Sequence, residues 1–345
     1  MASEVKTTTI PIKDLERLVE TAMRNLGYPA DEAATLTEIM MHAEVHNNSQ
    51  GISKLYDVTS PGGIKFNPDA GPLIVERDSM LGAVVNGNQR SGMSALSKAV
   101  QLAVSKAKSG PGMAITGTHN TYTSTGMLAY YASEVGKNDL IGIVMAQSPE
   151  LVAPHGGKKA VFGTNPICVA IPGPDDGPVI LDMATAAVTL FGLITSKANG
   201  QQLPPGVAVG PDGQPTRDPD QALKGALLTF GGHKGSGLSL VVELLGGVLP
   251  GGATAGGAVS KKEAKNWANT VIAIDPALLM DLGEFKQKVK QVCAHVKSTG
   301  ERVLLPGEIE KRHYARNMSK GTLDVSTALL GKIQELAAAT PQARL

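Results

Sequence analysis

Apolar residues recur at helical spacing near the start of the chain. They line one face of a predicted helix over residues 12–26, which Gly27 ends, and of a second helix over 31–45. The Ala-, Leu- and Val-rich stretch 92–108 predicts a longer third helix. The polar sequence HNNSQGISK, residues 46–54, follows the second helix directly. Its imidazole, hydroxyls, amides and lysine indicate either a solvated helix end or an active-site segment.

From about residue 112 the pattern changes to short apolar runs of buried β-strand character, separated by glycine, proline and asparagine. The predicted strands are GMAIT, LIGIVMAQ, ICVAIP, PVILDMA and VIAID. Further helices are predicted over about 125–137, over LSLVVELLGGVL, up to about Val296, and from Leu323 to Ala339. Strands and helices follow one another in a mixed rather than strictly alternating order, which predicts an α/β (α+β) fold with a helical cap.

A chain of 345 residues is long enough for about two domains. We expect residues 1–80 and 305–345 to form a helical cap, because the C-terminal helix can fold back on the N-terminal ones. Residues 81–304 then form the sheet region.

Composition and charge exclude several classes of function. The net charge is +1 without a basic run, so we expect no nucleic-acid partner. No apolar run reaches the roughly 18–20 residues of a membrane span, and the N-terminus lacks a secretory signal. Cys168 and Cys293 lie in aliphatic surroundings, which excludes a disulfide framework and a cysteine-based zinc site. We therefore expect a small-molecule partner and no metal.

The final tripeptide, Ala343-Arg344-Leu345, keeps the small–basic–leucine pattern of a peroxisomal address. The expected location is therefore the cytoplasm or, through this tripeptide, the peroxisome or glycosome.

Several polar motifs are candidates for chemistry, although the G-x-G-x-x-G fingerprint between a strand and a helix is absent. The glycine-rich segment 231–237 opens a helix, and Lys234 in its first turn favours an anion there. Asp182 emerges at the carboxyl end of a buried strand, where α/β proteins bind ligands. His119 and His155 lie in loops of small residues and are candidate catalytic groups.

Six motifs together resemble the type-2 malate/L-lactate dehydrogenase family. They are SPELVAPHGG, FGTNPICVAIP, ILDMATA, LPPGVAVGPDGQPTRDP, GGHKGSGLSLVVELLGGVL and LPGE, in the family's order. The family also contains ureidoglycolate and sulfolactate dehydrogenases, 2,3-diketogulonate reductase and Δ1-piperideine-2-carboxylate reductase. The resemblance implies a mixed-sheet, non-Rossmann fold that binds NAD(H) or NADP(H), a homodimer, and hydride transfer to or from the carbon alpha to a carboxylate.

The resemblance also implies which residues contact the cofactor. They are Asn165, Leu181, Asp182, Met183, Ala184, Thr185, His233, Lys234, Gly307 and Glu308.

The chain departs from this family in the segment after the second helix. The family has Ser-His-Gly there, followed by an arginine; the histidine donates a proton and the arginine anchors the substrate carboxylate. Here the positions are Ser49-Gln50-Gly51 and Lys54. A second family histidine is aligned with the segment Ser124-Thr125-Gly126. The sequence is thus a variant with glutamine in place of the family's acid.

The missing acid leaves three interpretations of the chemistry open. His155, or else His119, supplies the proton; Lys234 or Lys54 does so from a buried site; or the substrate is a cyclic imine that arrives already protonated. In each case we expect Ser49 and Gln50 to hold the reacting atom and Lys54 to hold the carboxylate. Rival hypotheses are an inactive dinucleotide-binding paralogue and a Schiff-base lyase that uses Lys234.

Overall fold

The computed structural model describes residues 6–59, 63–173, 177–198, 200–253 and 265–340. The strands are β1 Thr7–Pro11, β2 Ile74–Asp78, β3 Gly82–Asn86, β4 Met113–Thr121, β5 Ile141–Ala146, β6 Val152–Ala153, β7 Ile167–Ile171, β8 Val179–Met183, β9 Ala208–Val209, β10 Ala226–Leu228, β11 Trp267–Ile274 and β12 Thr322–Ser326. The α-helices are α1 Ile12–Asn25, α2 Ala30–Val45, α3 Gly92–Ser109, α4 Leu128–Gly136, α5 Leu190–Ala198, α6 Pro219–Lys224, α7 His233–Val242, α8 Leu282–Lys297, α9 Glu308–Lys320 and α10 Thr327–Ala338. Two further helical turns bear on the site: the 3₁₀ turn η1 Ile52–Leu55 and the π-helix η2 Glu243–Val248.

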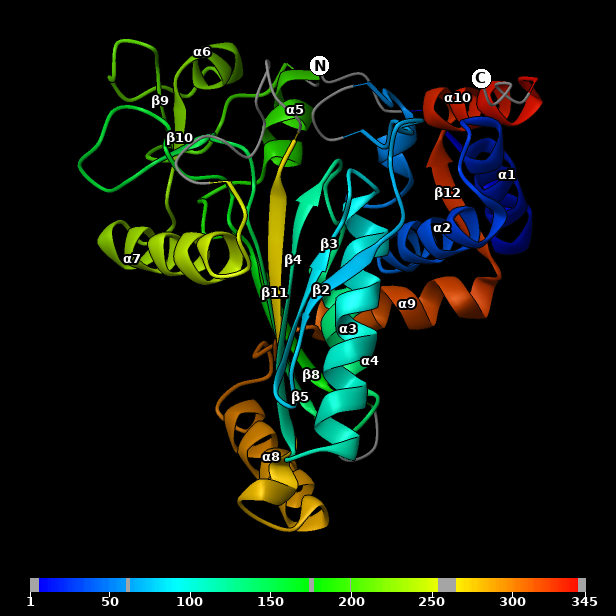
Figure 1. Ribbon diagram of the computed structural model, residues 1–345. Helices are drawn as coiled ribbons and strands as arrows, with labels where there is room; N and C mark the ends of the chain where they lie inside the picture. Colours follow the sequence, from blue (N-terminus) through cyan, green and yellow to red (C-terminus); the bar gives the residue numbers. More distant parts are fainter. Residues whose placement is uncertain (1–5, 60–62, 174–176, 199, 254–264, 341–345) are drawn as a thin grey trace.

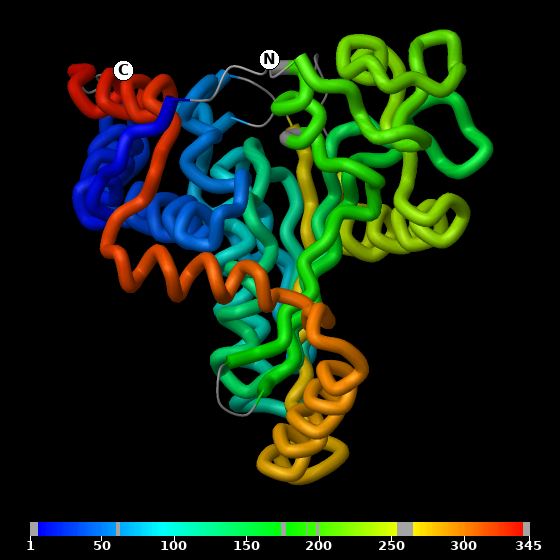
Figure 2. Tube along the Cα trace, turned by 180° about the vertical axis from the view of Figure 1, so that it is seen from behind, coloured from blue at the N-terminus to red at the C-terminus, as the bar shows by residue number. Residues whose placement is uncertain are grey.

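A seven-stranded sheet of order β2-β3-β4-β11-β5-β7-β8 runs through the centre of the molecule. Strands β3 and β4 are parallel and joined by α3, whereas the other pairs of this sheet are antiparallel. The predicted mixed sheet is therefore confirmed. A helical cap of α1, α2 and α10 lies on one side of the sheet, and a lobe with α5, α6 and α7 lies on the other (Figures 1 and 2).

The cap joins the two ends of the described chain. Strand β1 pairs antiparallel with β12, from Thr7 opposite Ser326 to Pro11 opposite Thr322. The prediction of a helix from Leu323 is wrong for its first four residues, which extend along β1 before α10 begins. Strand β2, which falls within the range assigned to the cap, pairs with β3 of the main sheet.

The N-termini of α2 and α3 have features that are typical of helix starts. Pro29 precedes α2, and Asp31 and Glu32 in its first turn complement the helix dipole. Ser91 caps α3 by accepting a hydrogen bond from Met93 N at 3.2 Å. The sequence therefore predicts where these two helices begin to within a residue.

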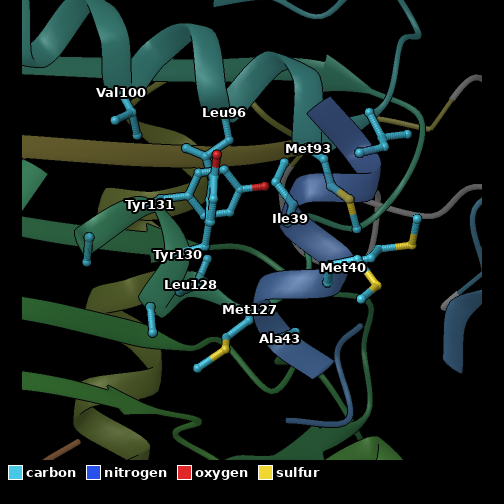
Figure 3. Close-up of a cluster of buried hydrophobic side chains, with 14 of the residues drawn as sticks. Ile39, Met40, Ala43, Met93, Leu96, Val100, Met127, Leu128, Tyr130 and Tyr131 are labelled. Carbon is cyan, nitrogen blue, oxygen red and sulfur yellow. The ribbon is translucent and has the colours of Figure 1, made fainter. Parts of the chain in front are cut away.

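Helices α2, α3 and α4 meet in a common apolar core, shown in Figure 3. Ile39 of α2, Met93 and Leu96 of α3 and Tyr131 of α4 are all fully buried in it. Each large side chain contributes about 1.5–3 kcal/mol through burial. This packing fixes α2 against the N-terminal ends of both α3 and α4.

Within the described part of the chain, no helix is long and apolar enough to cross a membrane. The same residues contain no group of three or more His, Cys, Asp or Glu side chains suited to a metal ion. The tripeptide Ala343-Arg344-Leu345 lies outside the described residues.

Candidate active site

The polar segment after α2 folds back on itself in a tight turn. Asn47 has a left-handed backbone with φ +56°, and the Asn48 side chain accepts a hydrogen bond from Gln50 N at 2.9 Å. A Cβ added to Gly51 would lie 2.6 Å from the Met40 carbonyl oxygen, so only glycine fits there. The turn therefore presses the Ser49–Gly51 backbone against α2.

Lys54 is the buried charge of this segment, with only 6% of its surface exposed. Its Nζ donates hydrogen bonds to Gln50 Oε1 and Ser124 Oγ, both at 3.0 Å. Burial lowers the pKa of Lys54 to about 8, because leaving water disfavours the ammonium form. The structure thus places an easily deprotonated lysine between Gln50 and Ser124.

The loop before α4 brings Ser124 to this lysine. Gly126 has φ +79°, and a Cβ placed on it would lie 3.5 Å from the Gln50 carbonyl oxygen. Tyr131, buried in the core, donates a hydrogen bond to the Thr125 carbonyl oxygen at 2.7 Å. The segments Ser49–Gly51 and Ser124–Gly126 therefore lie against each other.

The Asp182 side chain lies at the start of α4. Its Oδ2 accepts a hydrogen bond from Ala129 N at 2.9 Å, in the first turn of α4. By its accessible surface the residue is exposed, although many protein atoms enclose its carboxyl group. This enclosure, with repulsion from Glu310 on α9, raises the pKa of Asp182 to about 6.

The segment after Asp182 leads from the main sheet to the second lobe. Thr185 is buried; its N donates to the Thr164 carbonyl oxygen at 2.9 Å, and its own carbonyl accepts from Phe230 N at 3.1 Å. Leu181 is exposed, while Met183 and Ala184 are half-buried. Of the residues predicted to contact the cofactor, the segment from Leu181 to Thr185 thus leads continuously toward the glycine-rich loop.

The glycine-rich loop opens α7. Gly231 and Gly232 have φ +55° and +61°, and a Cβ built on Gly231 or Gly237 would meet no atom within 4 Å. His233 and Lys234 are exposed in the first turn of α7, which contains no acidic residue. The open backbone face, the helix N-terminus and the lysine suit the phosphates of a dinucleotide.

Asn165 serves an internal network near this loop. It is fully buried, and its Nδ2 donates to Glu243 Oε2 at 2.8 Å and to the Ser239 carbonyl oxygen at 3.2 Å. Gln147 Nε2 donates to the other carboxylate oxygen of Glu243 at 2.7 Å. We did not single out Glu243 from the sequence, although a lone acid in LSLVVELLGGVL is a signal for such a network.

Gly307 and Glu308 lie where β8 meets α9. Gly307 has φ +79°, and a Cβ there would lie 2.9 Å from the Ile180 carbonyl oxygen. Glu308 accepts hydrogen bonds from Lys297 Nζ at 2.8 Å and Leu305 N at 3.0 Å. The hydrogen bond from Lys297 has the largest effect on the pKa of Glu308 and the bond from Leu305 N the next largest. Together they lower this pKa to about 2. Its carboxylate therefore anchors the start of α9.

The two histidines predicted as proton donors have other neighbours. His119 Nε2 lies 2.8 Å from Glu76 Oε2 on β2. His155 N donates to Ser236 Oγ at 3.0 Å, and its ring centre is 6.1 Å from that of His233. His155 is thus associated with the glycine-rich loop, and Lys54 with the cap.

Ser49 is exposed, and its carbonyl oxygen accepts a hydrogen bond from Ser53 Oγ at 2.5 Å.

Comparisons with known proteins support one family for the whole chain. The malate/L-lactate dehydrogenase family model matches residues 10–334. The malate/(S)-sulfolactate dehydrogenase of Methanothermus fervidus is 34% identical over 326 residues, which cover 93% of this chain and 94% of that protein. The Δ1-pyrroline-2-carboxylate reductase 1 of Burkholderia ambifaria is 30% identical over 331 residues, covering 93% and 95%.

A solved structure agrees with these matches. The Δ1-piperideine-2-carboxylate reductase of Pseudomonas syringae superposes with a TM-score of 0.85 at 28% identity, covering 96% of this chain and all of that one (100%). The fold and the sequence therefore point to the same group of proteins.

Proposed function

Because the chain belongs to the malate/L-lactate dehydrogenase family, whose members are NAD(P)-dependent dehydrogenases and reductases acting on CH–OH or C=N groups, we propose that it transfers hydride between a nicotinamide and the α carbon of a small 2-oxo or 2-hydroxy acid. The observation that carries this proposal is the buried ammonium of Lys54 between Gln50 and Ser124.

The proposed cofactor is NAD(H) or NADP(H), which supplies or accepts the hydride when bound. The open backbone of the glycine-rich loop and Lys234 would hold its phosphates, with His233 beside them. The cofactor would then lie along the segment from Leu181 to Thr185, in the direction of the cap. Asn165, Gly307 and Glu308 would shape this surface rather than bind directly, because their side chains or backbones already have protein partners.

Lys54 is the proposed contact for the substrate carboxylate, with Ser49 and Gln50 beside the reacting atom. A charge-assisted hydrogen bond to a carboxylate is stronger than a neutral one, and more so away from water. Lys54→Ala should therefore raise KM for a carboxylate substrate roughly 10-fold or more. An unchanged KM would contradict the carboxylate contact.

The function itself is tested by steady-state assays with NADH and NADPH in parallel. The acceptors are pyruvate, oxaloacetate and Δ1-piperideine-2-carboxylate, each scanned from about pH 5 to 10. Turnover of a keto acid supports the proposal. Absence of turnover with all three, in protein that still binds the dinucleotide, would favour an inactive paralogue.

A second candidate function is reduction of a cyclic imine carboxylate. Gln50 favours it, because glutamine has no proton to donate and an iminium substrate needs only hydride. The similarity to a Δ1-pyrroline-2-carboxylate reductase points the same way. Turnover of the imine alone in the same assays would establish this candidate over the first.

The proposed partner, besides a small carboxylate, is a second copy of the chain. An exposed apolar stripe on α7 and η2 supports this: Leu240, Val241, Leu244, Leu245, Val248 and Leu249.

We also propose the C-terminal tripeptide as a peroxisomal or glycosomal address. A fluorescent fusion with and without the last three residues tests it, and cytoplasmic signal from both would contradict it.

A further inference from the structure

The Ser124 hydroxyl accepts one hydrogen bond and can still donate another. Its oxygen accepts the hydrogen bond from Lys54 Nζ. Among the residues that the structure describes, Lys54 is the only hydrogen-bond partner of that oxygen. A serine hydroxyl can accept and donate at the same time. The hydroxyl can therefore donate its proton to a ligand while its oxygen stays hydrogen-bonded to the Lys54 ammonium.

Lys54 and Ser124 differ in their access to solvent. Lys54 is buried, whereas Ser124 and Gln50 are half-buried and keep some accessible surface. A substrate that reaches the segment 122–126 from outside therefore meets the hydroxyl before the ammonium. A proton can then pass from Nζ to Oγ and from Oγ to the substrate, each step over one hydrogen bond.

We propose that Lys54 and Ser124 form the proton-donating pair of this enzyme, with Gln50 as a positioning residue that holds the ammonium in place. This inference rests on the proposed function and deepens it. It assigns the acid to the two segments in which this chain lacks histidine. Lys54 would in addition attract the substrate carboxylate, because in a 2-oxo acid this group is bonded directly to the reacting carbonyl carbon.

The proposed step balances as follows. The dinucleotide, when bound, would supply a hydride to the carbonyl carbon, and the carbonyl π electrons would become a lone pair on oxygen. That oxygen takes the proton of Ser124 Oγ, while Oγ takes a proton from Lys54 Nζ. Lys54 is left as a neutral amine and regains a proton from solvent. In the reverse direction the neutral amine accepts the proton of the alcohol.

The surroundings of Lys54 suit an acid that works near neutral pH. Burial lowers its pKa to about 8. The titratable groups on the packed elements are engaged elsewhere: Glu44 accepts from Ile52 N, Tyr131 donates to the Thr125 carbonyl oxygen, and Lys332 and Glu335 of α10 pair with each other. At pH 7 the ammonium form predominates, so reduction should slow as pH rises through about 8 and oxidation should speed up.

The decisive variant is Lys54→Arg, which keeps the charge but removes the acid, because a guanidinium does not release its proton. For a keto acid we expect kcat to fall about 100-fold or more, with KM within about 3-fold of wild type. Ser124→Ala should behave likewise, and Ser124→Thr should retain most of kcat. With a cyclic iminium as substrate, Lys54→Arg should keep its kcat.

A readout without cofactor or turnover accompanies the kinetics. In protein labelled with ¹³C at lysine Cε, we expect Lys54 to titrate near pH 8 by NMR. Ser124→Ala and Gln50→Leu should each lower this pKa further, because each removes a hydrogen bond that favours the ammonium. A Lys54 signal unaffected by either variant would contradict the pair.

Three kinetic results would overturn the inference. One is a wild-type kcat for the keto acid in Lys54→Arg, which would leave Lys54 as a carboxylate contact only. Another is a rate that falls through a pKa near 6 to 7 and is lost in His155→Ala or His119→Ala, which would assign the acid to histidine. The third is wild-type protein that reduces no carbonyl, which removes the proposed function as well.

Discussion

At the scale of single residues, Asp182 combines two opposing influences. The hydrogen bond from Ala129 N favours its charged form, whereas enclosure disfavours it and dominates, so that its pKa rises to about 6. The folded protein then binds this proton more tightly than the unfolded chain. The stability contributed by the carboxyl is therefore complete below about pH 4 and declines as pH rises to about 6.

This linkage predicts a pH-dependent effect of Asp182→Asn. The amide oxygen can still accept from Ala129 N, but it never becomes charged. We expect the variant to have a higher Tm than wild type at pH 8, and the difference to vanish as pH approaches 4. Differential scanning fluorimetry across this range measures it, with Asp69→Asn on an exposed loop as the control. A Tm difference that is the same at every pH would contradict the assignment.

At the scale of elements, the network around Glu243 connects α7 and η2 to the main sheet. Gln147 follows β5, Asn165 precedes β7, and both donate to the same buried carboxylate. A hydrogen bond to a charged group contributes about 1.5–3 kcal/mol, and a buried carboxylate left short of a donor costs a similar amount. The network therefore fixes the glycine-rich loop relative to the sheet.

Gln147→Leu tests this network. We expect it to lower the free energy of unfolding by about 2–3 kcal/mol, because Glu243 loses one of its two amide donors and stays buried. Urea denaturation followed by circular dichroism measures the change. Gln291→Leu on the exposed surface of α8 is the matched control and should change stability by less than about 0.5 kcal/mol. Equal effects of the two substitutions would show that the network is not stabilising.

Elements also show what a sequence can and cannot predict. Helix α3 follows from a 3.6-residue period and a serine cap, and α2 from its apolar positions and the acidic residues of its first turn, so their bounds are predicted closely. Strands β1 and β12 pair across more than three hundred residues, and the exposed Thr-rich run of β1 carries little apolar pattern. The short spacing of Gln50 and Lys54 is visible in the sequence. The contact of Lys54 with Ser124 depends on how three helices pack, which no local pattern encodes.

At the scale of the whole molecule, the second lobe leaves an apolar helix face exposed. Leu244 and Leu240, one helical turn apart, are 48% and 47% exposed, and the stripe continues along η2 to Leu249. Apolar surface of this extent in an otherwise well-packed chain is typical of an interface. A twofold dimer would place two such stripes against each other, because the same surface serves both copies.

If the proposed dimer forms through this stripe, Leu244→Glu should shift it to monomer, since each copy would bring a carboxylate into an apolar contact. Light scattering coupled to size exclusion measures the mass directly. Leu279→Glu is the control: this leucine is 91% exposed but lies apart from the stripe, next to α8. We expect the control to keep the mass of wild type. If wild type is itself monomeric, or if Leu244→Glu stays dimeric, the second copy does not bind through this face. Loss of dimer with an unchanged Tm in the variant would show that each copy folds by itself and that α7 and η2 serve assembly.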